Sequence, residues 1–408
     1  MTDQLKRGIS SLASSSKLYP QEKLLEVKKD HRQLFIGIPK ESSKQEYRIG
    51  LSPKAVELLS ANGHKIVVQS GAGKASNFSD HEYSEAGAKI SDDPDEVFAS
   101  DIVLKVKFPT LKELEKIQNG KTLISTIHFR DNLKDRINLI NQKKITAIGY
   151  EYIEDKVGGL PIVRAMSEVA GCAVVPIATE LLSSTNQGPG VLLGGITGVP
   201  PSKVVILGAG TVGEYAARAA LGFGADVTVL DPHIYKLRRL RHLLNNQLST
   251  STIDHALLEK LLKDADVVIG ALRTEKGEFQ YIVSEDLVRQ MKGGAVIIDV
   301  GIDDGGCFES SEPTNLSDPT FEKYGVTHYC VPNIASRVPR TASKALSNIF
   351  TPIFLEASKC GGIDEMIFNQ RWFMQGVYAY KGMLTNYYLS KHLGMNYKNL
   401  DLLLASRN

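Results

Sequence analysis

The most informative stretch of the sequence is KVVILGAGTVGEYAARAALGFGADVTVLD, residues 203–231. Its apolar, β-branched run at 204–207 predicts a short buried strand. A glycine-rich turn and an alanine-rich amphipathic helix follow, and a second apolar run at 227–230 ends in Asp231. This order of strand, turn, helix and strand predicts a βαβ unit of a parallel sheet.

The glycine-rich turn has the GxGxxG pattern of a dinucleotide-binding unit. Gly208 permits the tight turn, Gly210 lets a pyrophosphate approach the backbone, and Gly213 lets the helix pack closely on the strand. Thr211 and Val212 complete the turn at the helix N-terminus, where free N–H groups and the helix dipole favour phosphate. The pattern alone also fits a purely structural turn, but together with the flanking strands it predicts a nucleotide site.

The acidic residue that ends the second strand selects the cofactor. Asp231 lies 23 residues after Gly208, the right reach for the ribose hydroxyls of NAD. Its carboxylate would repel a 2′-phosphate, so NAD is expected in preference to NADP. Lys236, Arg238 and Arg239 could soften that preference, although we favour their interpretation as a solvated helix face.

Composition limits the class of protein. A chain of 408 residues with 42% hydrophobic content suits two domains of ordinary size. A net charge of +2 does not indicate binding to nucleic acid or to an anionic membrane. The sequence contains no apolar run of eighteen residues, so we expect no transmembrane helix. Four widely spaced cysteines form no zinc pattern, so we expect no metal site and a cytoplasmic protein with reduced thiols.

The rest of the chain alternates between expected strands and helices. Apolar runs predict strands at 34–38, 65–69, 102–106, 123–127, 146–149, 266–270, 295–300 and 327–331. Helices are expected at 53–61, at 165–184 and throughout the tail from residue 342. The fold class is therefore α/β, with two Rossmann-like domains that have parallel sheets and are separated by a cleft.

Four polar residues follow the ends of expected strands, where open α/β sheets bind their ligands. They are Arg48, Lys107, His128 and Asp303. Arginine can clamp a carboxylate with two parallel bonds, lysine adds a point charge, and histidine titrates near neutral pH. Position alone leaves plainer interpretations open for each: a solvated arginine, a lysine at a strand end, a capping histidine, an aspartate that orders a turn.

Several stretches together resemble the alanine dehydrogenase family and the related soluble α part of the proton-pumping nicotinamide nucleotide transhydrogenase. They read IGIPKE, EYRIGLSP, GHKIVVQSGAG, LKVKFP, MSEVAG, VVILGAGTVG and IDVGIDDGGCFE, in this order. The resemblance covers most of the chain, from about residue 34 to about residue 381. Several matching stretches in one order are much more specific than the glycine turn alone.

The resemblance implies roles for the four polar residues. Arg48 in EYRIGLSP matches the family arginine that binds the substrate carboxylate, and Lys107 in LKVKFP matches the lysine that contacts the substrate. His128 matches the histidine of the catalytic pocket, and Asp303 in GIDDGG matches the catalytic aspartate. Ser167 in MSEVAG and the loop from Val331 through Asn333 resemble cofactor contacts of the family.

Some residues around the expected pocket depart from the family. The family commonly has Lys-Glu-Pro where this chain has Phe108 between lysine and proline, and Arg130 lies in an unexpected Phe-Arg-Asp run after His128. Ile334 and Ala335 replace a methionine or leucine followed by proline. These changes put the exact substrate in doubt more than the reaction class.

The resemblance also implies a domain division. Residues 1–33 are expected as an N-terminal extension, and 162–340 as the NAD-binding domain. The substrate domain would combine 34–161 with 341–408, because the helical tail has no strand of its own to pack on.

The implied function is that of an oxidoreductase: NAD-dependent, reversible oxidative deamination of L-alanine to pyruvate and ammonia. Its partner would be a small amino acid or 2-oxo acid, and the family pattern suggests a homo-oligomer, either hexamer or dimer. Two alternatives remain at this point: a nucleotide-binding transhydrogenase α part, and a dehydrogenase of a larger amino acid. The sequence determines neither the physiological direction nor the role of residues 1–33.

Overall fold

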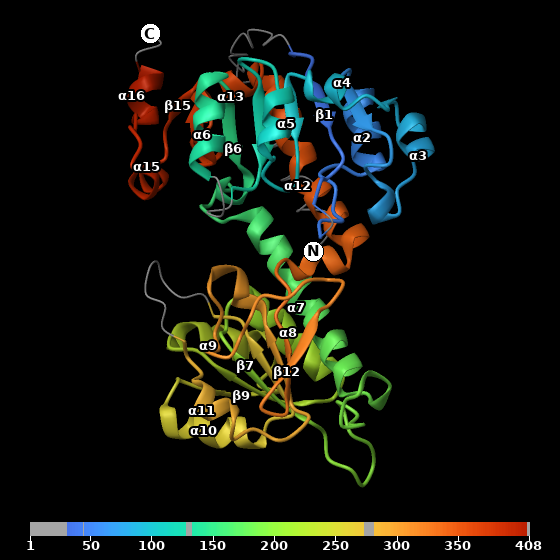
Figure 1. Ribbon diagram of the computed structural model, residues 1–408, viewed down its shortest axis with the longest axis vertical. Coiled ribbons are helices and arrows are strands. Elements are labelled where there is room, and N and C mark those ends of the chain that lie inside the picture. The colour runs from blue at the N-terminus through green and yellow to red at the C-terminus, as the bar shows by residue number, and fades with distance from the viewer. Residues whose placement is uncertain (1–30, 44, 128–132, 273–280, 406–408) are drawn as a thin grey trace, which may run out of the picture.

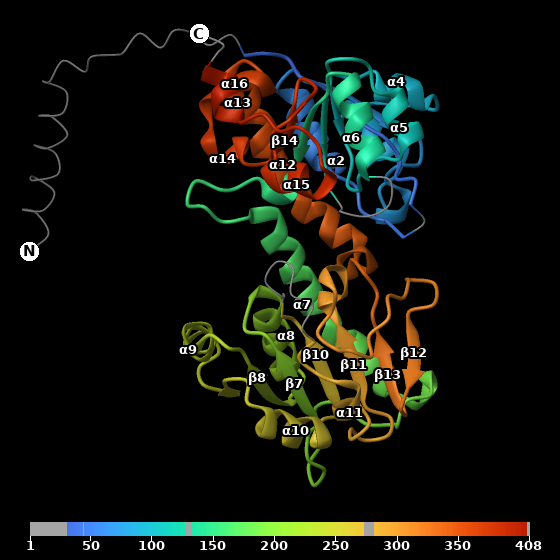
Figure 2. The same ribbon diagram turned by 60° about the vertical axis from the view of Figure 1, so that its left-hand side comes forward.

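The chain folds into two lobes, each built around one sheet (Figure 1). The computed structural model describes residues 31–43, 45–127, 133–272 and 281–405. Two long helices, α7 (Pro161–Leu182) and α12 (Pro339–Cys360), run between the lobes and contact each other (Figure 2). The upper lobe in Figure 1 contains blue and red segments together, so early and late parts of the chain share it.

The first sheet has eight strands in the order β15-β14-β6-β5-β4-β1-β2-β3. Their bounds are β1 (Phe35–Ile38), β2 (Lys65–Gln69), β3 (Lys89–Ser91), β4 (Ile102–Leu104), β5 (Thr122–Ser125), β6 (Thr146–Gly149), β14 (Val377–Tyr380) and β15 (Met383–Leu384). Strands β1 to β6 pair in parallel, whereas β14 pairs antiparallel with both β6 and β15. The sheet is therefore mostly parallel, with an antiparallel edge.

Apolar side chains cover both faces of this sheet. Ile124 and Ile148 belong to the core beneath α12, whereas their neighbours Leu123 and Ala147 face the opposite core, as the two-residue period of a strand requires. The helices of this lobe are α2 (Pro53–Ala61), α3 (Asp80–Glu85), α4 (Pro94–Phe98), α5 (Leu111–Lys116), α6 (Leu133–Gln142), α13 (Ile363–Asn369), α14 (Arg371–Met374), α15 (Tyr387–Leu393) and α16 (Leu400–Ala405).

The second sheet has seven strands in the order β12-β13-β11-β10-β7-β8-β9. Their bounds are β7 (Lys203–Leu207), β8 (Asp226–Leu230), β9 (Ser249–Ser251), β10 (Val267–Gly270), β11 (Val296–Asp299), β12 (Thr320–Lys323) and β13 (Val326–Tyr329). The helices are α8 (Thr211–Gly222), α9 (Ile234–Leu243), α10 (His255–Asp264) and α11 (Glu285–Val288). Strand order reverses between β7 and β10, which is where open α/β sheets bind ligands.

The expected fold class is confirmed, with two corrections. The tail after residue 342 is not entirely helical, because β14 and β15 lie within it and extend the first sheet. Neither sheet is purely parallel, since β12 is also an antiparallel edge strand. Both corrections concern short strands at or next to the edge of a sheet, whose partners cannot be found from local sequence.

Several strands and helices begin or end at residues other than those expected from the sequence. Strand β4 ends at Leu104 rather than at residue 106, and β5 ends at Ser125 rather than at 127. Helix α7 begins at Pro161, earlier than expected, and includes Pro176. The βαβ unit appears as expected, with α8 between β7 and β8.

Helix α7 is long and apolar enough, by length and composition alone, to cross a membrane. It nevertheless packs along α8 and α12, and nine of its residues are buried, which is typical of a central helix in a folded protein. One helix that passes this test is weak support for a membrane span.

Candidate functional site

A cleft of about 970 Å³ opens between the two lobes. Nine residues singled out in the sequence lie on its wall: Arg48, Lys107, Ser167, Gly210, Thr211, Val212, Asp231, Asp303 and Asn333. Gly208 and Gly213 shape the turn behind this wall. His128 lies outside the described residues.

The glycine turn leaves room for a ligand at one position only. Gly208 has φ +114°, a conformation that side chains rarely adopt, and a Cβ at Gly213 would overlap the carbonyl oxygen of Gly208. At Gly210, by contrast, no described atom lies within 4 Å of where a Cβ would stand. Because Gly210 precedes α8, a phosphate there would meet the free N–H groups of the helix N-terminus.

The acid after β8 is buried and already hydrogen-bonded. Asp231 is fully buried; its Oδ2 accepts from Ala209 N at 2.8 Å and its Oδ1 from His233 N at 2.8 Å. Arg239 donates to the carbonyl of Ala209 at 3.2 Å. Of the three nearby cations named from the sequence, Lys236 is the one on the cleft wall.

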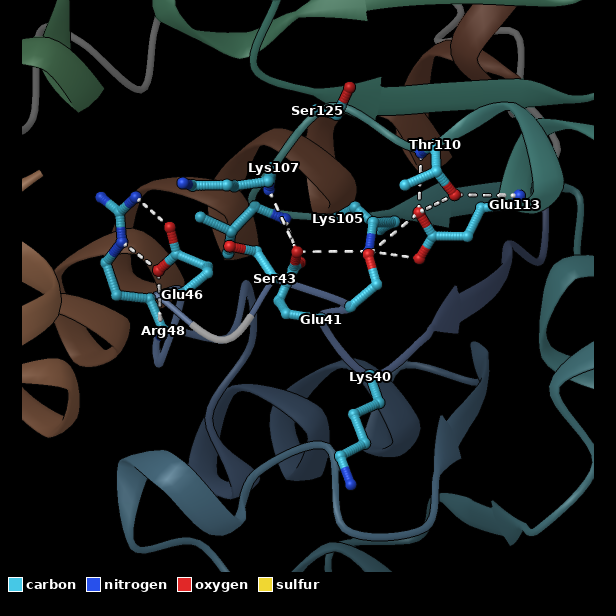
Figure 3. A network of polar contacts seen from close by, with 12 residues as sticks. Lys40, Glu41, Ser43, Glu46, Arg48, Lys105, Lys107, Thr110, Glu113 and Ser125 are labelled. Atoms are coloured by element: carbon cyan, nitrogen blue, oxygen red, sulfur yellow. Dashed lines mark hydrogen bonds and ion pairs between the residues drawn. The ribbon is translucent and has the colours of Figure 1, made fainter. Parts of the chain in front are cut away.

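Arg48 enters the substrate side of the cleft in a buried ion pair with Glu46 (Figure 3). Its Nε and Nη2 donate to the two Glu46 oxygens at 2.7 and 2.8 Å, and Nη1 donates to Met166 Sδ at 3.3 Å. Burial alone would lower the pKa of Arg48, but the charge of Glu46, the hydrogen bonds to Glu46 and the nearby Tyr150 and Glu41 together raise it. Three of the five guanidinium N–H groups are used, so Nη1 and Nη2 each keep one donor.

Lys107 is the second cation on this side of the cleft. Its backbone N–H donates to Glu41 Oε2 at 3.3 Å, and its side chain extends away from that carboxylate (Figure 3). In the part of the chain that the structure describes, its ammonium makes no hydrogen bond or ion pair. Lys107 can therefore add a second positive charge to the wall that carries Arg48.

A second buried ion network supports the segment that carries Lys107. Lys105, 1% exposed, lies between Glu41 at 3.2 Å and Glu113 at 2.9 Å (Figure 3). Glu41 also accepts from Val106 N at 2.7 Å. Burial raises the pKa of Glu41, against the lowering effect of Lys105. This network fixes the backbone just beyond β4, so that Lys107 faces the cleft.

Glu151 is a carboxyl on the cleft wall that has one oxygen without a partner. Its Oε1 accepts from Ile127 N at 2.7 Å, while Oε2 is buried and has no hydrogen bond with any described residue. Burial raises the pKa of Glu151 to about 7. This carboxyl can therefore hold or release a proton near neutral pH.

On the opposite wall, Asp303 lies in the short helix η4 (Val300–Asp304), which follows β11. Asp303 is exposed, and its Oδ2 accepts from Asn333 N at 3.1 Å. Behind it, buried Asp299 accepts from Gly301 N at 3.1 Å and from Cys307 N at 2.9 Å, which fixes both ends of this turn.

The residues expected from the sequence do not include Glu46, the Glu41–Lys105–Glu113 network, Glu151 and Arg136. Arg136 lines the cleft with its guanidinium 5.4 Å from the centre of the Phe108 ring, and its buried Nε has no partner among the described residues. Glu46 could have been noticed as an acid two residues before Arg48. No local pattern distinguishes Glu151, because its burial depends on the folded lobe.

These features define a class: a two-domain α/β protein that places a dinucleotide turn opposite a cluster of cations suited to a small carboxylate. The chain belongs to the alanine dehydrogenase/PNT family. The N-terminal domain of that family matches residues 37–170, and the C-terminal domain matches residues 174–387. The resemblance noted in the sequence is thus confirmed.

Individual relatives agree with this assignment. Alanine dehydrogenase 2 of Staphylococcus aureus strain USA300 is 39% identical over 367 residues, which cover 90% of this chain and 98% of that protein. A solved L-alanine dehydrogenase is 34% identical, with a TM-score of 0.83 over 87% of this chain and 98% of the other. A transhydrogenase from Sinorhizobium meliloti, 22% identical with a TM-score of 0.74 over 86% of this chain and 99% of the other, shares the fold.

Proposed function

We propose that this protein catalyses the reversible, NAD-dependent oxidative deamination of L-alanine to pyruvate and ammonia. The observation that carries the proposal is the pairing, across one cleft, of a glycine turn and Asp231 with Arg48 and Lys107. The relatives named alanine dehydrogenase support the same reaction.

The residues present fit NAD. The open space at Gly210 and the N-terminus of α8 would receive the pyrophosphate, and Asp231 lies at the β8 end, where a ribose would lie. Ser167 and Asn333 line the same cleft and would complete the cofactor site. Bound NAD⁺ would supply the hydride acceptor.

The substrate carboxylate would bind to the remaining Arg48 donors and to the Lys107 ammonium, which together offer two-point and point-charge recognition. Asp303 would act on the amine from the opposite wall. His128 remains our proposed general acid–base on the strength of the sequence, since it lies outside the described residues. Holding both reactants in a closing cleft would supply much of the rate.

The test is a screen of purified protein for NAD reduction against the common amino acids. L-Alanine should give the highest kcat/KM, and His128→Ala should lower turnover roughly 100- to 10,000-fold while leaving NADH binding nearly intact. No turnover of L-alanine by the wild-type protein would refute the proposal. It would favour a nucleotide-binding coupling role like that of a transhydrogenase α part.

One observation favours a second candidate, the dehydrogenase of a larger amino acid. Phe108 occupies the position where the family commonly has an acid, and the Arg136 guanidinium lies 5.4 Å from the centre of its ring, with no ion pair to a described acid. A cation on this part of the wall would suit a substrate with an additional acidic group. The same screen decides, because L-aspartate or L-glutamate would then exceed L-alanine in kcat/KM.

We also propose a cytoplasmic, homo-oligomeric enzyme, a hexamer or a dimer, whose substrate domain combines 34–161 with 341–408 around the 162–340 NAD-binding domain. Support for the division comes from β14, which pairs with β6 in the first sheet. Light scattering of the purified protein would measure the oligomeric state.

A further inference from the structure

Behind the cleft wall, the carboxylate of Glu46 accepts hydrogen bonds from donors in both lobes. Its Oε1 accepts from Arg48 N at 3.0 Å, from Arg48 Nε at 2.7 Å and from Ser336 Oγ at 2.8 Å. Its Oε2 accepts from Arg48 Nη2 and from Asn333 Nδ2, both at 2.8 Å. Two of the five donors therefore come from the loop after β13.

Asn333 continues this network to the catalytic side. Its side chain donates to Glu46, while its backbone N–H donates to Asp303 Oδ2 at 3.1 Å. Asn333 has φ +61° and ψ 54°, a left-handed conformation that orients its two donors toward these different acids. A continuous series of hydrogen bonds thus runs from Arg48 through Glu46 and Asn333 to Asp303.

The charge of Glu46 makes this network strong. Its side chain is fully buried, and although burial would raise its pKa, the adjacent Arg48 and its hydrogen bonds lower that pKa to about 2. Glu46 is therefore ionised at neutral pH. Charge-assisted hydrogen bonds in a buried site are both strong and directional, so they restrict where the Arg48 guanidinium can lie.

We propose that Glu46 is a positioning residue that orients Arg48 for the substrate carboxylate and couples this arginine, through Asn333, to Asp303 in the other lobe. The inference rests on the proposed function, because it assigns Arg48 and Asp303 to one substrate. Substrate binding at Arg48 and the placement of Asp303 then become a single cooperative event.

Glu46→Gln tests the proposal, because it keeps the shape but replaces one accepting oxygen with an N–H donor that faces other donors. We expect the KM for pyruvate to rise roughly 10- to 100-fold, with kcat and the NADH dissociation constant changed much less. Glu46→Asp, which keeps the charge, should recover part of the loss. A merely structural role would reduce the amount of active enzyme, and so the apparent kcat, but not KM.

Ser343→Ala is the matched control. Ser343 accepts from Ile49 N at 2.9 Å, so it binds the same segment to α12 without contacting Glu46. This variant should lose stability yet keep its KM for pyruvate within about twofold of wild type. An equal rise of KM in Ser343→Ala and Glu46→Gln would overturn the proposal.

A double-mutant cycle and hydrogen exchange test the coupling itself. Asn333→Gly preserves the left-handed backbone and removes the side-chain donor. If the two residues act together, the rise of KM in the double variant should be smaller than the product of the rises in Asn333→Gly and Glu46→Gln. Amide exchange at residues 331–337 should be faster in Glu46→Gln and unchanged in Ser343→Ala. Multiplicative effects, or wild-type exchange in Glu46→Gln, would refute the coupling.

The exchange measurement does not depend on turnover. If the wild-type protein turned over no amino acid, the proposed function would fail, and exchange at residues 331–337 would still decide the role of Glu46. If wild type were active and KM and exchange both stayed normal in Glu46→Gln, the inference alone would fail.

Discussion

The two walls of the cleft present different chemical groups: one is mainly backbone, and the other is mainly charged side chains. The cofactor wall is mainly backbone: a glycine turn, a helix N-terminus and one buried acid, Asp231. The substrate wall is mainly charged side chains, in which Arg48 depends on Glu46 and the Lys107 segment depends on the network around Lys105. A backbone site tolerates little change of residue size, whereas a side-chain site tolerates little change of charge.

The largest expected effect is on the substrate wall. Arg48→Met leaves the Glu46 charge buried without its partner, so the free energy of unfolding should fall by about 3–5 kcal/mol, and kcat/KM for L-alanine by about 1,000-fold or more. Denaturant unfolding and steady-state kinetics would measure both quantities.

The control for this prediction lies in the other lobe. Arg218 is 54% exposed and pairs with Glu214 at 3.4 Å, so Arg218→Met should cost about 1 kcal/mol or less. A comparable loss of stability in the two variants would contradict the contrast between the walls.

The next effect concerns the backbone wall. Gly210→Ala places a methyl group where no described atom lies within 4 Å and where the backbone is extended, so the melting temperature should not change. NADH affinity should nevertheless fall by about 100-fold, because the methyl group blocks the approach of the pyrophosphate. Calorimetric titration with NADH would measure the loss.

Gly222→Ala serves as its control, since Gly222 is also unobstructed but lies at the far end of α8. This variant should bind NADH as wild type does. Normal NADH affinity in Gly210→Ala would mean that the cofactor does not approach the turn.

A smaller effect is expected for cofactor selection. Asp231→Asn keeps one accepting oxygen for the turn but removes the charge that would repel a 2′-phosphate. The ratio of kcat/KM with NAD to that with NADP should fall by about 10-fold. An unchanged ratio would show that residues other than Asp231 select between NAD and NADP.

The smallest effect concerns Glu151. The pKa of Glu151 is about 7 in the folded protein, compared with the ordinary glutamate value of 4.5 that applies to the unfolded chain. Folding therefore favours the protonated carboxyl. Stability is therefore expected to fall as pH rises from about 4.5 to about 7, and to change no further above that range. Glu151→Gln should remove this fall, which we expect to be on the order of 1 kcal/mol because the carboxyl borders the cleft.

Unfolding curves of wild type and Glu151→Gln across pH 4.5 to 8 would measure the difference. Parallel pH profiles for the two proteins would show that Glu151 does not titrate in this range.

Sequence reasoning succeeded where local pattern determines structure. The βαβ unit from β7 to β8 follows from apolar runs and glycine spacing. Nine of the residues named from the sequence line the cleft, as expected where the parallel strands of a sheet end at one edge. The start of α2 follows from local residue types as well, because serine is a favoured N-cap and proline a favoured first helical residue; Ser52 indeed accepts from Ala55 N, and Pro53 begins the helix.

It failed where structure depends on distant partners. The residues of β14 have strand-like composition, but they join the first sheet only because β6 lies beside them. Glu46 and Glu151 are acids whose roles come from burial and from the loop after β13 or the segment before His128. No local spacing predicts such pairing, because it is set by the packing of the two lobes.

The antiparallel edge of the first sheet has a consequence for synthesis of the chain. Lys381 N bonds to Thr146 Oγ1 across 235 residues of sequence, and β14 pairs with β6. At bacterial or eukaryotic translation rates of roughly 5–20 residues per second, β6 waits tens of seconds as an unpaired edge. The second lobe, which is continuous from β7 to β13, emerges whole in that interval. The first lobe therefore begins synthesis first but is completed last, and until then β6 presents an unpaired edge, which is a liability for aggregation.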